Sequence, residues 1–172
     1  GVGSIKYFDS QYLPVGDGFQ LVATVSSMED LLELDDSDSV SVDGRATDIA
    51  VADICSADGA PDGLDDIALT VGVSPGSVYI VINDGTGNVD SQITYSAGDG
   101  PSSLDAGELD GDGTLDLAIA NANNDSFFVL VNDGGTASSM TPLAPVSTGD
   151  LPVDILIINI DDDVDNDVVI AC

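Results

Sequence analysis

The stretch 108-ELDGDGTLDLAIAN-121 places four acidic side chains around two glycines and leads directly into an apolar segment. Like charges repel one another, and the apolar residues that follow have to enter a hydrophobic core. A bound cation would neutralise the repulsion, and the glycines permit a sharp turn that side chains would block. The stretch therefore predicts a cation-binding loop that is followed by a buried β-strand.

Oxygen-bearing groups stand at alternate positions along this loop, which lets a tight turn direct all of them inward. They are the side chains of Glu108, Asp110, Asp112 and Asp116 and the backbone carbonyl of Thr114. Calcium accepts roughly six to eight oxygen ligands at about 2.3–2.6 Å, whereas magnesium requires a stricter octahedral geometry and keeps bound water. We therefore predict that the loop binds calcium through these five residues.

The same unit occurs three times in the chain. The copies are 47-TDIAVADICSADGAPDGLDDIALT-70, 102-SSLDAGELDGDGTLDLAIAN-121 and 152-PVDILIINIDDDVDNDVVIAC-172. The last acid before the second apolar run is Asp66, Asp116 or Asp167, so the copies are 50 and 51 residues apart. Repeats with a period near 50 residues indicate a repeat fold such as a β-propeller.

Each unit contains short apolar segments, many of them β-branched, that are separated by glycine and aspartate, as is typical of β-strands. The segments that flank the acidic loops are 49–54 and 67–71, 104–109 and 117–120, and 155–160 and 168–171. A third segment follows in 77–87 and 126–136, and a fourth in 93–97 and 143–147. None shows convincing helical periodicity. We predict an all-β fold, a β-propeller-type array of four-stranded antiparallel blades.

The predicted organisation is an N-terminal β segment at 1–46, repeat 1 at 47–101, repeat 2 at 102–151 and repeat 3 at 152–172. Within the N-terminal segment, 19–27 and 39–42 resemble third and fourth strands, whereas repeat 3 stops after its second strand. The two ends could complete one sheet, which gives about three blades where closed propellers have about four to eight. We therefore expect a piece of a larger propeller, or a chain that pairs its sheet edges with another copy.

The other two loops repeat the oxygen pattern with departures. In repeat 3 the predicted calcium ligands are Asn159, Asp161, Asp163, the carbonyl of Asp165, and Asp167. In repeat 1 they are Asp53, Asp58, Asp62, the carbonyl of Leu64, and Asp66. Val164 replaces the glycine of repeat 2, while an insertion and Cys55 interrupt the loop of repeat 1. The alternative is that these aspartates form turns and keep solvated side chains.

The residues "ELDGDGTLDLAIAN" and "FFVLVNDGG" resemble the FG-GAP/VCBS repeat, the calcium-loop blade of integrin α-chain propellers and of many secreted microbial proteins. The resemblance covers about residues 47–172 and is strongest in repeat 2. It implies a β-propeller architecture, calcium in the loop between the first two strands of a blade, and a role in extracellular recognition or adhesion.

Charge and hydropathy restrict the partners. The 172 residues include 32 acidic and 2 basic ones, and the formal net charge of −30 repels phosphate backbones and anionic membranes. The chain has no apolar run of roughly 20 residues and no basic and apolar leader, so we expect a soluble chain without membrane insertion. We expect that a signal was removed or that the chain is cut from something larger. Salt adaptation is a second, compatible explanation of the acidic surface.

Catalysis is not expected. The absence of histidine excludes Ser-His-Asp, Cys-His and HExxH sites within the chain, although a carboxylate pair for glycoside hydrolysis stays formally possible. Cys55 and Cys172 are not expected to form a disulfide, because strand alternation sends them to opposite ends of their sheets.

We therefore predict a secreted or cell-surface calcium-binding module that recognises a protein or carbohydrate. The alternatives are the propeller portion of a larger secreted enzyme and a scaffold that self-associates through its sheet edges.

Overall fold

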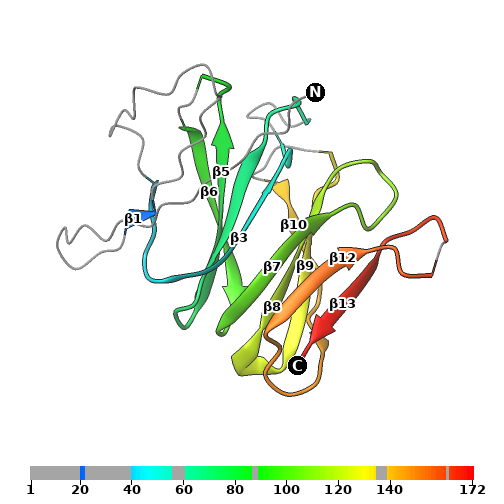
Figure 1. Ribbon diagram of the computed structural model, residues 1–172. Helices are drawn as coiled ribbons and strands as arrows, with labels where there is room; N and C mark the ends of the chain where they lie inside the picture. Colours follow the sequence, from blue (N-terminus) through cyan, green and yellow to red (C-terminus); the bar gives the residue numbers. More distant parts are fainter. Residues whose placement is uncertain (1–19, 22–39, 56–60, 87–88, 135–138, 162) are drawn as a thin grey trace, which may run out of the picture.

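The computed structural model describes residues 20–21, 40–55, 61–86, 89–134, 139–161 and 163–172. In this part of the chain the regular elements are antiparallel β-strands and one 3-10 helix, η1 (Ala122–Asn124) (Figure 1). The predicted all-β, propeller-type fold of four-stranded antiparallel blades is confirmed, because both central sheets have that form.

Repeat 1 forms one complete blade, which we call blade 1. Its strands are β3 (Ala46–Ala52), β4 (Asp66–Val71), β5 (Gly76–Asn83) and β6 (Val89–Gly98). They pair antiparallel in chain order, and the apolar residues of β4 and β5 are almost all buried. The acidic loop of repeat 1, residues 53–66, leads from β3 into β4.

Repeat 2 forms blade 2, whose fourth strand is broken. Its strands are β7 (Pro101–Gly107), β8 (Asp116–Asn121), β9 (Ser126–Val131), β10 (Thr141–Pro142) and β11 (Val146–Ser147). Both short strands pair with β9, but three residues separate them where β9 has two. The extra residue makes a bulge, and neither Pro142 nor Pro145 has an N–H group for a ladder hydrogen bond. The expectation of one fourth strand over 143–147 is therefore wrong.

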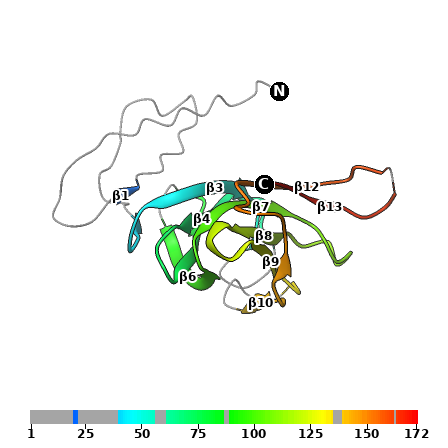
Figure 2. The ribbon, with the colours of Figure 1, turned by 90° about the horizontal axis from the view of Figure 1, so that it is seen from below.

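Two further strand pairs complete the described structure. They are β12 (Asp154–Ile158) with β13 (Asp167–Ala171), and β1 (Gln20–Leu21) with β2 (Val40–Ser41). Figure 2 shows the first strands of the three repeats, β3, β7 and β12, side by side, while β6 and β10 lie on the opposite side of the molecule. This radial arrangement is that of propeller blades.

Side chains of neighbouring blades share common hydrophobic clusters. Leu104, Leu117 and Ile119 of blade 2 belong to one cluster with Ala68, Val78 and Ile80 of blade 1. Ile155 and Ile157 pack in the same way with Ala118 and Ala120. A Cβ at Gly107 would lie 2.4 Å from Cγ2 of Ile157, so a glycine is needed at this close approach.

Polar contacts repeat at the same junctions. The Thr47 hydroxyl donates to the carbonyl of Pro101 (2.9 Å), and the Ser102 hydroxyl donates to the carbonyl of Pro152 (2.6 Å). Thr47 and Ser102 hold the same position in their repeats, so the blades are joined by one recurring arrangement of core and hydrogen bonds.

Both cysteines are free thiols in the structure. Cys55 is buried at the loop end of blade 1, and Cys172 is exposed after β13, at the end of that pair remote from its acidic loop. In the described part of the chain, no helix has the length and the hydropathy that are needed to cross a membrane.

Candidate metal centre

Asp116 anchors the acidic loop of repeat 2, residues 108–116. This first residue of β8 is fully buried, and its Oδ1 accepts a hydrogen bond from the backbone N–H of Asn132 (2.8 Å). Its Oδ2 accepts one from the N–H of Leu109 (2.9 Å). Burial raises the pKa of Asp116, and the charges of Asp110 and Asp112 add to that shift, while the two hydrogen bonds oppose it.

Two triads of carboxylates meet in this loop. Oxygen atoms of Glu108, Asp110 and Asp116 lie within 4.8 Å of one another, and those of Asp110, Asp112 and Asp133 do so as well. Asp110 belongs to both triads, so four of the predicted ligands are brought together, with Asp133 as an addition. Asp133 follows β9, which means that the cluster links the β7–β8 loop to the turn after the third strand.

The backbone of the loop is shaped by its own side chains. Asp112 Oδ1 accepts hydrogen bonds from the N–H (2.8 Å) and the hydroxyl (2.6 Å) of Thr114, and both lower the pKa of Asp112. The Glu108 carboxylate accepts a hydrogen bond from the N–H of Gly111. Gly111 and Gly113 have φ of +85° and +86°, which glycine adopts without strain. The turn therefore depends on the two glycines that the sequence places there.

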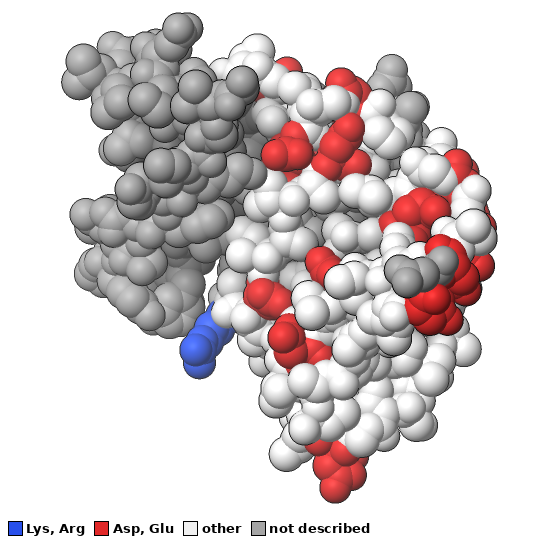
Figure 3. Space-filling model, turned by 45° about the vertical axis from the view of Figure 1, so that its right-hand side comes forward, with Lys and Arg blue, Asp and Glu red and all other residues white. Residues whose placement is uncertain are grey.

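The residues fit a hard divalent cation. Arg45 is the basic residue in the described part of the chain, and Figure 3 shows its blue side chain apart from the acidic patches. Among the described residues, no basic side chain thus lies beside the converging carboxylates to offset their repulsion. Asn132, whose backbone N–H bonds to Asp116, donates from its side-chain amide to the carbonyl of Ile54 in blade 1 (3.0 Å). Carboxylate oxygens are donors that calcium prefers.

The loop of repeat 1 has the same anchor. Asp66 is buried at the start of β4, where its Oδ2 accepts from the N–H groups of Ile54 (3.1 Å) and Cys55 (3.0 Å). Its Oδ1 accepts from the N–H of Asn83 (3.0 Å). Burial is the main cause that raises the pKa of Asp66, and the three hydrogen bonds oppose it.

The rest of this loop does not form an acidic cluster among the described residues. Both oxygens of Asp53 accept backbone hydrogen bonds, from Asp62 N (3.1 Å) and Gly63 N (2.9 Å), and Asp62 Oδ1 accepts from Leu64 N (2.9 Å). Asp58 lies outside the described residues. The structure therefore does not bring Asp53, Asp62 and Asp66 together as a metal site.

The loop of repeat 3, residues 159–167, keeps the hydrogen bonds of repeat 2. Asp167 Oδ2 accepts from Ile160 N (3.0 Å), and Asp163 Oδ1 accepts from Asp165 N (2.9 Å). The described residues of this loop form no carboxylate triad, so Asp161 and Asp163 stay predicted ligands. The amide of Asn166 donates to the carbonyl of Glu108 (2.9 Å), which joins this loop to the loop of repeat 2.

Residues 58–119 match the family model described as an FG-GAP-like repeat. The matched segment runs from the repeat 1 loop through β4 to β7 and across the acidic loop of repeat 2 into β8. The predicted resemblance to FG-GAP repeats is confirmed for this part of the chain, which is similar to an FG-GAP-like repeat. FG-GAP repeats are propeller blades, in agreement with the sheets of the structure. A comparison with curated proteins gives no match.

Proposed function

We propose that this chain is a non-catalytic, calcium-binding recognition module that acts outside the cell. The observation that supports it most directly is the position of Asp110, whose carboxylate belongs to two triads that have no basic side chain beside them in the described part of the chain. A calcium ion held by Glu108, Asp110, Asp112, Asp116 and Asp133 would supply the positive charge that this cluster lacks.

The proposed ion has a structural role. Because Asp133 follows β9 and the other acids precede or open β8, an ion on them would connect two segments of blade 2 that the chain separates by a hairpin. At millimolar calcium and a dissociation constant near 10⁻⁴ M, typical of extracellular modules, such a site stabilises the fold by about 1.4 kcal/mol. The ion would thus hold rigid the loops that a recognition module presents.

The proposed location and partners follow from the family and the charge. FG-GAP repeats occur in extracellular proteins, where calcium is abundant, and the predicted partners are a protein or a carbohydrate. A net charge of −30 disfavours nucleic acids and anionic membranes.

Thermal unfolding in chelator and in millimolar calcium tests the proposal. We expect calcium to raise the midpoint by about 3–6 °C, the shift that about 1.4 kcal/mol produces in a domain of this size. Asp110→Asn should remove most of this shift, since its carboxylate is shared by both triads. Asp150→Asn, which alters an exposed residue remote from the triads, should keep it. Coincident curves for the unchanged protein would contradict the proposal.

A further inference from the structure

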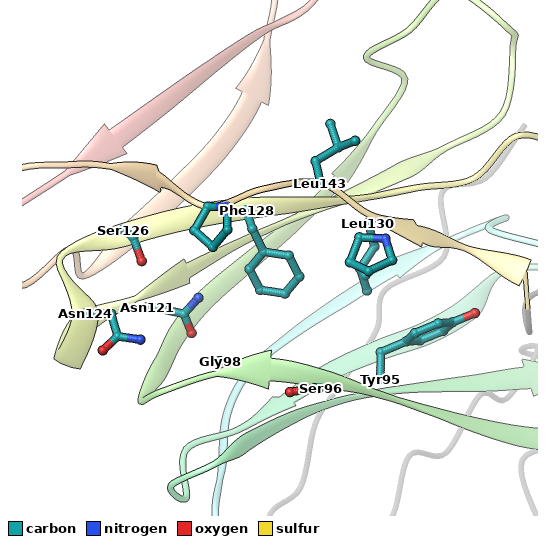
Figure 4. Close-up of a pocket in the computed structure, with 11 residues that line it drawn as sticks. Tyr95, Ser96, Gly98, Asn121, Asn124, Ser126, Phe128, Leu130 and Leu143 are labelled. Atoms are coloured by element: carbon teal, nitrogen blue, oxygen red, sulfur yellow. The ribbon is translucent and has the colours of Figure 1, made fainter.

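An open cavity of about 310 Å³ lies between blades 1 and 2 (Figure 4). Strand β6 supplies Tyr95, Ser96 and Gly98, and the opposite wall comes from β8, η1, β9 and the residues around the break between β10 and β11. The cavity runs along β9 from Ser126 to Leu130, and its lining includes none of the carboxylates of the acidic loop. It is therefore separate from the candidate metal centre.

The broken fourth strand of blade 2 accounts for the cavity. In blade 1, β6 pairs with β5 along its whole length, whereas in blade 2 the outer strand leaves the ladder between Pro142 and Val146. Pro142, Leu143 and Pro145 from this break line the cavity. The opening thus depends on a break that the fourth strand of blade 1 does not have.

The polar groups of the cavity are uncharged. In a chain with 32 acidic residues, the lining contains none, and its polar side chains are those of Tyr95, Ser96, Asn121, Asn124 and Ser126. Asn121 is 2% exposed, and its Oδ1 has no hydrogen-bond partner among the described residues. Figure 4 shows its amide between Gly98 and the ring of Phe128. Rotation of the side-chain amide exchanges its oxygen and its nitrogen. The amide can therefore present either an acceptor or a donor to the cavity.

The remaining wall is apolar and carries aromatic rings. This apolar wall is formed by the side chains of Tyr95, Phe128 and Leu130 and by the prolines of the broken strand. The Tyr95 hydroxyl accepts a hydrogen bond from the N–H of Met140 (3.0 Å), which fixes the ring in place. A ligand for this site combines an apolar ring face with several neutral groups that both donate and accept hydrogen bonds.

We propose that this cavity binds one uncharged sugar ring. The C–H face of a pyranose suits the aromatic wall, its hydroxyls suit the amides of Asn121 and Asn124, and the size of the cavity corresponds to a small ligand. This proposal deepens the recognition role proposed above and rests on it, because it assigns the carbohydrate partner to a particular place.

Two-dimensional ¹H–¹⁵N NMR of the calcium-loaded chain, titrated with neutral methyl glycosides of mannose, galactose and N-acetylglucosamine, tests it. We expect at least one glycoside to shift the side-chain amide signals of Asn121 and Asn124 saturably, with a dissociation constant in the millimolar range. Asn124→Ala should weaken binding about fivefold, the loss expected for one neutral hydrogen bond. Asn123→Ala, in the same short helix but outside the lining, should leave binding unchanged.

Asn121→Leu removes the buried amide at nearly constant volume and should weaken binding at least as much, while the exposed Asn124 provides a test that does not disturb the core. No saturable shift with any glycoside, equal losses in Asn123→Ala and Asn124→Ala, or saturation by a proline-rich peptide in place of the glycosides would overturn the proposal. If calcium still raises the unfolding midpoint in that case, only the sugar site is wrong. If glycosides bind without any effect of calcium, the sugar site stands and the metal proposal fails.

Discussion

The acidic loops of repeats 1 and 2 share a buried aspartate at their end, but they differ in how their other acidic side chains are arranged. Asp66 and Asp116 each open a second strand, are buried, and accept backbone hydrogen bonds from residues just after the first strand and from the asparagine at the end of the third. Glu108 and Asp110 form a triad with Asp116, and Asp110 forms a second one with Asp112 and Asp133, whereas around Asp66 the described residues form no such cluster. The comparison separates two roles of acidic residues, which are building the loop and binding an ion.

The difference arises from what the other acids bind. Asp53, which corresponds to Glu108, uses both oxygens on the N–H groups of Asp62 and Gly63, which follow the insertion. Cys55 occupies the place of Asp110, and burial together with the charges of Asp66, Asp53 and Asp62 raises the pKa of its thiol to about 12. A loop can therefore be rich in acids and yet have its oxygens satisfied by its own backbone.

The largest expected effect is the loss of stability when the buried aspartate of either loop is replaced. In chelator, Asp66→Ala leaves three backbone N–H groups without an acceptor and Asp116→Ala leaves two, so we expect losses of about 3 and about 2 kcal/mol in the free energy of unfolding. Urea unfolding measures both. Asp→Asn at either position retains one acceptor oxygen and should cost less. Losses below about 0.5 kcal/mol, the range of surface substitutions, would show that the carboxylates do not hold the loops.

The repeat frame was predictable from the sequence because it is carried by local patterns. Short apolar segments around Asp66, Asp116 and Asp167 mark the strands, and their spacing of 50 and 51 residues sets the blades. The broken outer strand was not predictable in this way. Residues 143–147 suit a strand by composition, and the break results from the ladder hydrogen bonds that the prolines on either side cannot form.

The candidate site was predictable only within the loop. Glu108, Asp110, Asp112 and Asp116 lie close in sequence, so alternate spacing was enough to group them. Asp133 reaches the same cluster through the pairing of β8 with β9, and the sequence marks it only as part of an Asn-Asp-Gly turn. The backbone partners of Asp53 were also beyond prediction, because they depend on how the insertion folds.

We expect substitutions in the two loops to differ in their effect on calcium affinity. Asp112→Ala and Asp116→Ala should each remove most of the calcium-dependent gain of about 1.4 kcal/mol, because they take a carboxylate from a triad. Asp62→Ala should retain it, since Asp62 lies in the loop without a triad and accepts a hydrogen bond from Leu64 N. Calorimetric titration with calcium measures the affinities. A greater loss for Asp62→Ala would mean that repeat 1 holds the ion.

The smallest expected effect is on the pH dependence of the free energy of unfolding, and it arises from the Cys55 thiol. A thiol pKa raised from 9.0 to about 12 means that the folded chain disfavours the thiolate, so stability is full below pH 9 and is lost as the pH rises toward 12. At pH 9 the unfolded thiol is half ionised, and this costs about 0.4 kcal/mol relative to pH 7. The difference in free energy of unfolding between the unchanged chain and Cys55→Ala should shift by that amount, because other titrating groups cancel.

At pH 8 a thiol reagent should label the exposed Cys172 and spare Cys55. Rapid labelling of Cys55 would contradict its burial beside Asp66, and with it the physical cause of the raised pKa.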